Sequence, residues 1–343
     1  MRLPGIVAPI FQSLIGLALV FALGLGLVGL VLKKELPDGW KNIQPPADVN
    51  ALLEVGDTIW SGGRDGLDVI DRDSGQFLYS IQADQPLKFV TALATDGDQI
   101  FVGHQNGISI FQRGAWHTLT SGGGLPAGRV LALCFSEKTG LWAGTETGLA
   151  NEQAGKFKVY GQADGMAGDF IFSLFEDDQG HLWVGNGQDN LNAGLSMWDG
   201  IQWRNFSVKD GLAHNKINFI TQTRDGMLWF ATGDSGRGGA SYYDGKTFRT
   251  LTQADGLASD HTRYIFQDTD GILWIGSESA GIARRDSAGW QLLTPDEGLA
   301  GLEVKAMLED SQGNLWFGTE RGLTRIADTN KKDITKFAKP PDT

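Results

Sequence analysis

Short apolar runs, separated by glycine, aspartate and other turn residues, recur along most of the chain. One group of four such runs comprises residues 217–221, 228–231, 240–243 and 248–251. The runs are short and rich in β-branched or aromatic side chains, which predicts strands and not helices. Asp225 and Gly226 lie between the first two runs. Glycine accepts a positive φ angle and aspartate hydrogen-bonds its own backbone, so both favour a tight hairpin. We therefore expect short antiparallel strands, and no amphipathic helix between residues 49 and 327.

An aromatic residue in the second run of each group sets the period of the pattern. It lies in phrases such as Gly313-Asn-Leu315-Trp316-Phe-Gly318, and its copies around Trp60 and Phe101 are the least regular. The position recurs at residues 60, 101, 142, 183, 229, 274 and 316, which are 41 to 46 residues apart. A period of about 40–45 residues with many short strands is typical of propeller blades. Seven copies predict an all-β fold, a seven-bladed β-propeller of four-stranded blades, in which these aromatic residues pack between blades.

The fourth run of each group predicts how the ring closes. In six groups this run opens with an aromatic residue, at positions 77, 116, 157, 203, 248 and 290. The last group has no such residue, but residues 40–44 ahead of the first group resemble residues 203–207. We expect residues 40–44 to supply the outer strand of the blade whose other three strands come from residues 303–327. Such a pairing joins the two ends of the ring and removes free strand edges. An alternative assigns this outer strand to residues 334–337.

An apolar segment precedes the repeats. Residues 6–32 contain no ionisable side chain, and a helix of this length exceeds the roughly 30 Å hydrocarbon core of a bilayer. Cleavable signal peptides have a shorter apolar stretch, of about 7–15 residues. We therefore divide the chain into an N-terminal membrane anchor with one transmembrane helix (1–35), the propeller (36–327) and a polar C-terminal tail (328–343). Basic residues flank the segment on both sides, so charge does not set its orientation.

Composition excludes several function classes. The net charge of −12 disfavours nucleic-acid binding, which requires a basic surface. The chain contains no spacing typical of nucleotide-binding, zinc-protease or serine-hydrolase motifs. The single cysteine, Cys134, lies in an inner strand and is expected to be a small core residue. Paired aspartates such as Asp268 and Asp270 are turn residues, because no bidentate glutamate follows at calcium-loop spacing. We expect no catalytic residue, no metal and no cofactor.

Positions just after the recurrent Asp-Gly-Leu phrase are candidates for ligand binding. The phrase itself suits a turn between blades, with its leucine plugging the crevice. Counting six residues past the leucine gives positions that should flank the central channel, namely Leu131, Phe172, Asn218, Arg263 and Lys305. With residues four past it, they give a cationic cluster of Arg129, Lys216, Arg263 and Lys305, beside His214 and His261. Clustered cations at a concave mouth favour a carboxylate or sulfate ligand. The alternative is loop charge balanced by Glu303 and the turn aspartates.

Two repeats are longer than the others after the ladder tryptophan. Their additional residues fall at 186–192 and 234–239. Polar loops on a rigid scaffold commonly carry binding function, and amide-rich loops suit oligosaccharide recognition. The candidate residues in these loops are Asn186, Gln188, Asp189, Asp234 and Arg237. Irregular hairpins without a ligand are the alternative interpretation.

The repeat unit resembles the two-component regulator propeller family. Residues 297–323 carry it almost whole, with Glu297-Gly298-Leu299, Asp310, Gly313, Leu315-Trp316 and Gly318-Thr319. The resemblance is good over residues 125–323 and implies the extracytoplasmic sensor region of bacterial membrane histidine kinases, which often recognise carbohydrates. The chain shows no kinase or DNA-binding module. A weaker resemblance is to seven-bladed streptogramin-inactivating lyases, but no motif here corresponds to their catalytic residues, and fold likeness alone does not transfer chemistry.

The expected function is a membrane-tethered, non-catalytic, ligand-binding or sensory propeller. The resemblance places it outside the cytoplasm, on a bacterial cell membrane that it crosses once. Its ligand would be an oligosaccharide or an anionic small molecule, and its signal would pass through a membrane partner protein. One alternative is a lyase or hydrolase acting through His214 or His261. Another is a protein-interaction platform in a membrane complex.

Overall fold

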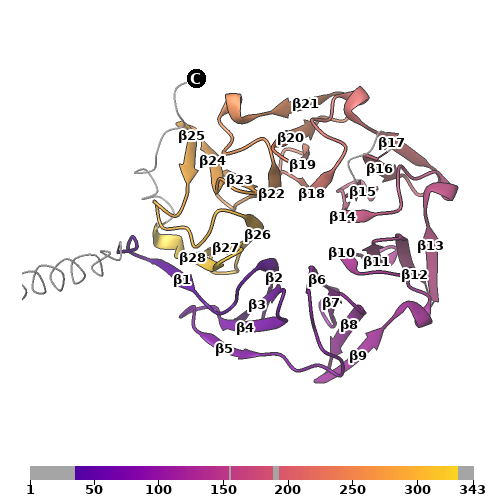
Figure 1. Cartoon of the computed structure of the whole chain (residues 1–343), viewed down its shortest axis with the longest axis horizontal. Helices are drawn as coiled ribbons and strands as arrows, with labels where there is room; N and C mark the ends of the chain where they lie inside the picture. Colours follow the sequence, from indigo (N-terminus) through magenta and orange to yellow (C-terminus); the bar gives the residue numbers. More distant parts are fainter. Residues whose placement is uncertain (1–34, 154–155, 188–192, 331–343) are drawn as a thin grey trace, which may run out of the picture. The chain divides into compact units, whose positions relative to one another are not determined.

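A computed structural model describes residues 35–153, 156–187 and 193–330. Residues 38–343 form one compact unit, in which seven sheets are arranged as blades around a centre (Figure 1). This is the seven-bladed propeller of four-stranded blades that the repeat predicts. The apolar run at 6–32 lies outside the described residues. Within the described ranges we find no helix with the length and hydropathy of a membrane span.

Each blade is a four-stranded antiparallel sheet numbered here from its inner strand outward. Blades 1 and 2 comprise β2 (Val49–Val55), β3 (Thr58–Gly63), β4 (Leu67–Asp71), β5 (Phe77–Ser80), β6 (Ala92–Thr95), β7 (Ile100–His104), β8 (Gly107–Gln112) and β9 (Ala115–Leu119). Blades 3 and 4 comprise β10 (Val130–Ser136), β11 (Gly140–Thr145), β12 (Gly148–Gln153), β13 (Lys156–Tyr160), β14 (Ile171–Glu176), β15 (Leu182–Asn186), β16 (Leu195–Trp198) and β17 (Trp203–Phe206). Blades 5 and 6 comprise β18 (Ile217–Gln222), β19 (Leu228–Asp234), β20 (Arg237–Tyr243), β21 (Phe248–Leu251), β22 (Thr262–Gln267), β23 (Leu273–Ser277), β24 (Ile282–Asp286) and β25 (Gly289–Leu293). Blade 7 comprises β26 (Val304–Glu309), β27 (Leu315–Thr319), β28 (Gly322–Ile326) and β1 (Trp40–Ile43).

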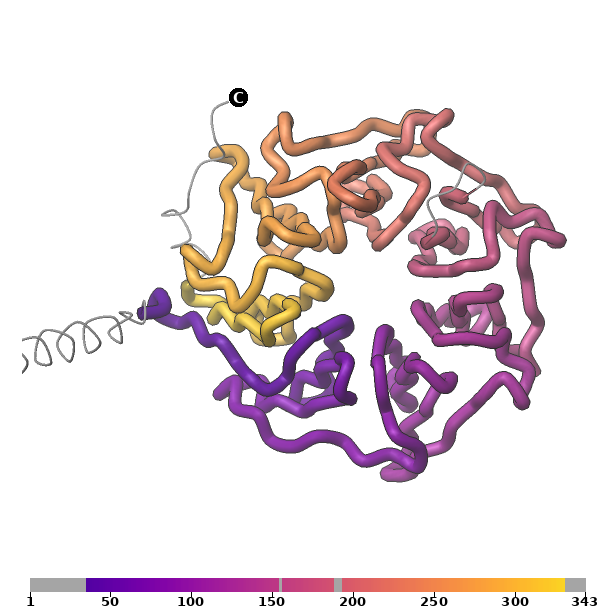
Figure 2. Tube along the Cα trace, viewed as in Figure 1, coloured from indigo at the N-terminus to yellow at the C-terminus, as the bar shows by residue number. Residues whose placement is uncertain are grey.

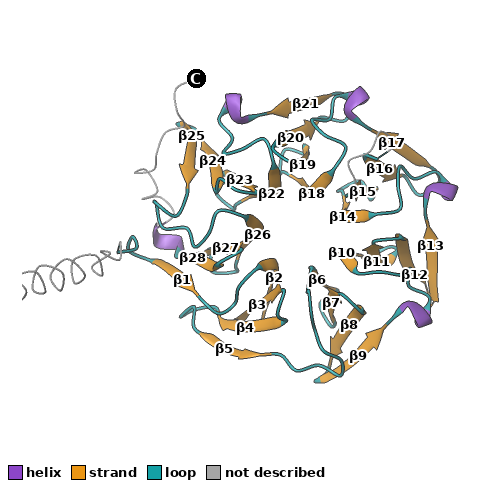
Figure 3. Ribbon diagram, viewed as in Figure 1, coloured by secondary structure: helices purple, strands orange, loops and turns teal. Residues whose placement is uncertain are grey.

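The helical elements are single 3₁₀ turns, four of which lie at the rim between blades (Figure 3). They are η1 (Ser121–Gly123), η2 (Gln162–Asp164), η3 (Val208–Asp210), η4 (Gln253–Asp255) and η5 (Asp328–Asn330). The first four coincide with the loops between blades. In η3, Asp210 accepts a hydrogen bond from the backbone N–H of Ser207 (2.8 Å), and Gly211 follows at a φ of 109°. Leu212 then packs its side chain into the core, where it is 4% exposed. The Asp-Gly-Leu phrase therefore has a structural role.

The first strand in the chain belongs to the last blade. β1 pairs antiparallel with β28, with Trp40 opposite Ile326 and Ile43 opposite Leu323. Figure 2 shows the indigo start of the ring beside its yellow end. Residues 40–43 thus complete blade 7, and the alternative segment 334–337 lies outside the described residues. The ordered chain continues past residue 327, because η5 is held to the ring by a hydrogen bond from the Asp328 N–H to the Asn314 side chain (3.1 Å).

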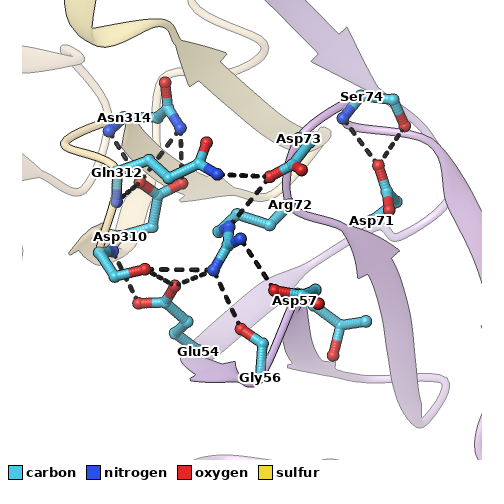
Figure 4. A network of polar contacts seen from close by, with 12 residues as sticks. Glu54, Gly56, Asp57, Asp71, Arg72, Asp73, Ser74, Asp310, Gln312 and Asn314 are labelled. Atoms are coloured by element: carbon cyan, nitrogen blue, oxygen red, sulfur yellow. Dashed lines mark hydrogen bonds and ion pairs between the residues drawn. The ribbon is translucent and has the colours of Figure 1, made fainter.

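A polar network reinforces the closure on the opposite side of the same two blades (Figure 4). The buried Arg72 of blade 1 donates to Glu54 (3.0 Å) and to the hydroxyl of Ser311 in blade 7 (3.1 Å). Gln312 of blade 7 donates in turn to Asp73 (2.8 Å). Blade 1 and blade 7 are therefore joined both by side chains and, next to them, by the β1–β28 ladder.

Candidate ligand site at the central channel

The seven inner strands surround a central channel (Figures 1 and 3). Residues from β2, β6, β10, β14, β18, β22 and β26 line a cavity of about 210 Å³ within it. Propellers place comparable positions of every blade side by side around their axis. Any side chain that points inward from the same register position therefore joins a ring.

A β-bulge selects the residues of this ring. In six blades the register between the inner strand and its neighbour shifts by one residue. The residues skipped by the ladder are Asn50, Leu131, Phe172, Asn218, Arg263 and Lys305, and all six line the cavity. Blade 2 contributes Thr91, which precedes β6 and lines the same cavity. A bulge turns an extra side chain out of the regular alternation of a strand, and here it does so seven times around or beside one axis.

The ring has an apolar arc and a polar arc. Blades 3 and 4 contribute Leu131 and Phe172, whereas blades 5 to 7 contribute Asn218, Arg263 and Lys305. Because these blades follow one another around the ring, the two kinds of side chain gather on different sides of the cavity. An apolar wall with a few convergent polar groups is typical of small-molecule sites.

Asn218 carries an unsatisfied acceptor. Its amide nitrogen donates to the carbonyl oxygens of Gly233 (3.1 Å) and Thr262 (2.7 Å), which fixes the orientation of the amide. The residue is 6% exposed, and its Oδ1 atom has no hydrogen-bond partner among the described residues. Buried polar atoms are nearly always paired. This oxygen is therefore suited to a hydroxyl or amino group from a ligand.

The cations of the polar arc are all engaged by carboxylates. Arg263 contacts Glu278 (2.9 Å) and Glu303 (3.1 Å). Lys305 contacts Glu303 (3.2 Å) and Asp48 of blade 1. Burial raises the pKa of Glu303, and the charges of Lys305 and Arg263 oppose this. Burial also acts to raise the pKa of Asp48, but the hydrogen bond and charge of Lys305 leave it lowered. The arc is a network of alternating charges, rather than a purely cationic surface.

The network continues toward blade 5 through a histidine. Lys216 contacts Asp234 at 3.3 Å, and His261 Nε2 lies 4.0 Å from Glu278 Oε2. Burial lowers the pKa of His261, although Glu278 acts to raise it, so the ring is neutral at pH 7. His214 is 7% exposed, and its Nδ1 atom accepts a hydrogen bond from the Lys216 N–H (3.0 Å).

The remaining candidates lie apart from the cavity lining. Arg129 is paired with Glu146 (2.8 Å). Asn186 ends β15 and is 3% exposed, whereas Gln188 and Asp189 lie outside the described residues. Arg237 pairs with Asp234 across the β19–β20 hairpin.

The interpretation of residues 234–239 as an elongated loop was wrong. β19 and β20 extend into this segment, and only residues 235–236 lie between them. The additional residues therefore lengthen a regular ladder. Glycine at 233, 238 and 239 permits it, because these positions have φ angles of 128° to 149°.

Three features of the site have no signal in the repeat. Asn50 and Thr91 come from the irregular first repeats, and Glu278 lies beyond the ladder tryptophan in a turn between β23 and β24. Among the described residues, no group of three or more His, Cys, Asp or Glu side chains is placed to hold a metal ion. Burial raises the pKa of the Cys134 thiol to about 11, so it is protonated at neutral pH.

Comparison with known proteins supports the meaning of the repeat. Four segments match the family model described as two component regulator propeller, at residues 165–188, 211–234, 256–279 and 298–321. The chain carries two-component regulator propeller repeats. Each matched segment runs from the turn between blades through the inner strand to the ladder strand of blades 4 to 7. These segments include Asn218, Arg263 and Lys305. A comparison with curated proteins found no significant match.

Solved structures show the same fold at low identity. The extracellular domain of the hybrid two component system BT3049 from B. thetaiotaomicron has a TM-score of 0.74 and 19% identity, covering 88% of this chain and 42% of that one. The WD40 propeller of Doa1 has a TM-score of 0.62 and 14% identity, covering 86% of this chain and 97% of that one. An inactive virginiamycin B lyase from Staphylococcus aureus, solved with quinupristin, has a TM-score of 0.62 and 15% identity, covering 84% and 98%. This chain thus spans less than half of the BT3049 domain, and the likeness concerns the fold alone.

Proposed function

We propose that the protein is a membrane-tethered sensory propeller that binds a small hydroxyl-bearing ligand in its central channel. The observation that carries this proposal is the buried, unpaired Asn218 Oδ1 on the wall of a cavity with one apolar and one polar arc. The two-component regulator propeller repeats support a sensory role. They also support an extracytoplasmic location, with the signal passing to a membrane partner protein.

The charge network favours a neutral ligand over a simple anion. A carboxylate or sulfate would have to displace Glu303 from Arg263 and Lys305, which would leave a buried carboxylate without its partners. A hydroxyl group can instead donate to Asn218 without breaking an ion pair. Phe172 and Leu131 on the facing arc suit the apolar face of a sugar ring.

The size of the cavity limits the ligand. Sites for drug-sized molecules usually measure roughly 300–1,000 Å³, and this cavity measures about 210 Å³. We therefore propose a single sugar residue, or the end of an oligosaccharide whose remainder stays outside the channel.

A thermal-shift screen of residues 38–343 tests the proposal. The panel contains neutral and acidic mono- and oligosaccharides, with Mg²⁺ and Ca²⁺ as separate arms. A ligand at about 100 times its dissociation constant adds roughly 2.7 kcal/mol to the stability of the folded state. We expect a neutral sugar to stabilise the protein and Asn218→Leu to abolish that shift, because leucine has no acceptor.

Asn151 offers a matched control. It is a fully buried asparagine that also donates to two carbonyl oxygens, those of Thr139 and Leu141, but it lies in β12 away from the cavity. Asn151→Leu should therefore cost similar stability and keep the ligand response. A response that survives Asn218→Leu would refute the channel site. Consumption of the ligand, lost in His261→Ala, would support an enzyme, and silence with a protein partner recovered by crosslinking would support an interaction platform.

A further inference from the structure

The outer strand of blade 1 is exposed and apolar. Among the strands of the ring, β5 is the one in which every residue is exposed. Phe77, Leu78 and Tyr79 are 38%, 45% and 56% exposed. We call these three residues the β5 patch. Three consecutive large apolar side chains in water are costly, which raises the question of what covers them.

The patch is uncovered because blade 1 lacks a device that other blades have. In blades 3 to 6 the 3₁₀ turn before the inner strand lies against the aromatic residue of the outer strand. Gly211 after η3, for example, is so close to Phe248 that a Cβ atom there would come within 3.1 Å of it. Phe248 is 8% exposed. Blade 1 is preceded by residues 44–48, which link β1 to β2 without a 3₁₀ turn, so Phe77 has no such cover.

The patch lies beside the start of the ring. The turn between β4 and β5 packs on β1, since Lys41 Nζ donates to the Ser74 carbonyl (2.9 Å). A Cβ atom on Gly75 would lie 3.3 Å from the Lys41 side chain and 3.4 Å from that of Arg325. The apolar segment ends at Leu32, seven residues before β1, a stretch that spans at most about 25 Å at 3.3–3.6 Å per residue.

Basic residues concentrate at this corner of an acidic protein. Lys33 and Lys34 precede β1, and Lys331 and Lys332 directly follow η5. η5 adjoins the start of β1, because the Ala327 N–H donates to the Gly39 carbonyl (2.9 Å). The nearby Asp73 is neutralised by Arg72 (3.1 Å). The surroundings of the β5 patch therefore combine aromatic, aliphatic and cationic groups.

We propose that the β5 patch rests on the surface of an anionic lipid bilayer, with Lys41 and Arg325 facing lipid headgroups. This inference rests on the membrane tether of the proposed function. Aromatic residues prefer the membrane interface, and each nearby lysine or arginine adds about 1 kcal/mol of attraction to anionic lipid. A patch of three residues is too small for a stable dimer, which buries roughly 1,200–2,000 Å². A tethered surface needs only weak affinity, because the anchor supplies a high local concentration.

The test places a fluorophore on the patch in the full chain. Leu78→Cys, in a Cys134→Ala background, is labelled with an environment-sensitive dye and reconstituted into phosphatidylcholine vesicles with or without phosphatidylglycerol. The control is Val159→Cys, which is 47% exposed on β13, the outer strand of blade 3. We expect nitroxide-bearing lipids to quench most of the label at 78, more so with phosphatidylglycerol, and to leave the label at 159 unchanged.

The outcomes separate this inference from the tether. A chain that floats with the vesicles while the label at 78 stays unquenched overturns the lipid contact and keeps the tether. A chain that does not float refutes both. Energy transfer between labels at 78 on different molecules, without lipid quenching, overturns the inference in favour of a second copy. Tyr79→Cys provides a second label if Leu78→Cys does not fold.

Discussion

At the scale of single residues, one aspartate links the hairpin turn to the ladder tryptophan. Asp310 is 4% exposed and accepts hydrogen bonds from the Asn314 N–H (2.8 Å) and from the indole N–H of Trp316 (2.8 Å). Asp177 and Asp268 bind Trp183 and Trp274 in the same way. The spacing in the Asp-x-x-Gly-x-Leu-Trp phrase thus has a physical cause, because six residues bring the indole back to the carboxylate that closes the turn.

Asp310→Ala should lower stability by about 3–5 kcal/mol, since it leaves at least two buried donors without an acceptor and each costs about 1–3 kcal/mol. Asp310→Thr is the matched variant, because blade 5 has Thr223 at this position and its hydroxyl still accepts from Trp229 (3.2 Å). Urea unfolding followed by circular dichroism measures both. Equal losses for the alanine and threonine variants would contradict this explanation.

A buried histidine predicts acid sensitivity. His104 is fully buried; its Nδ1 atom accepts from the Asn106 N–H (3.2 Å) and its Nε2 atom faces the Ser109 hydroxyl (2.9 Å). Burial lowers the pKa of His104 below its ordinary value of 6.5. The unfolded chain therefore binds a proton that the folded chain does not, and stability falls as the pH drops below 6.5.

The expected slope from this residue is at most about 1.4 kcal/mol per pH unit, because one proton is taken up. His104→Thr removes the titration and uses the residue found at the same position in blades 3 and 7, where Thr145 and Thr319 accept from the backbone N–H two residues on (3.2 and 3.1 Å). Urea midpoints between pH 7 and pH 5 should fall less steeply in this variant. An unchanged slope would show that His104 does not titrate on unfolding.

At the scale of elements, a side chain near the end of an inner strand fastens each of several blades to the preceding one. Gln222 of β18 accepts from the Asp178 N–H (3.0 Å), and Gln267 of β22 accepts from the Arg224 N–H (3.0 Å). Glu309 of β26 accepts from the N–H of Thr269 (2.6 Å). These bonds bind the hairpin turn of one blade to the sheet of the next, in addition to the apolar packing between them.

Glu309→Ala should lower stability by about 1 kcal/mol, the usual net contribution of such a bond. Glu309→Gln should stay within about 0.5 kcal/mol of the native chain, because its amide oxygen replaces the carboxylate as glutamine does in blades 5 and 6. Amide hydrogen exchange across residues 268–272 and urea midpoints report the change. If both variants lose the same stability, the charge of Glu309 matters and not the hydrogen bond.

At the scale of the whole molecule, the ring is closed by chain segments from opposite ends of the sequence. β1 covers the edge of β28 and buries Trp40 and Ile43, which are 8% and 5% exposed. Without β1, the β28 edge and the core of blade 7 would face water. Closure therefore converts the two least protected blades into ones as enclosed as the rest.

A chain that starts at residue 45 should be far less stable than one that starts at residue 38. The loss should exceed the roughly 3–5 kcal/mol of one large core truncation, because a whole strand is removed. Size-exclusion chromatography should show association through the exposed edge, and a peptide of residues 38–46 should reverse it by adding the missing strand. A monomeric chain with an unchanged melting temperature would refute the role of β1.

The sequence determined the architecture because its information is periodic. The ladder tryptophan recurs with one turn aspartate and one glycine per blade, and those residues act locally, within one hairpin. Asn218, Arg263 and Lys305 could also be assigned to the channel from their distance to the Asp-Gly-Leu phrase, since every blade repeats the same register.

Only the tertiary structure decided what these residues contact. Glu278 and Asp48 neutralise Arg263 and Lys305 from another turn and another blade, and no local pattern announces them. The bulge that turns Asn218 into the cavity depends on pairing between strands, as does the exposure of Phe77, whose cover is missing in the preceding connection. Hydrogen bonds within a hairpin are written in adjacent residues, whereas charge pairing and burial depend on which blades become neighbours when the ring closes.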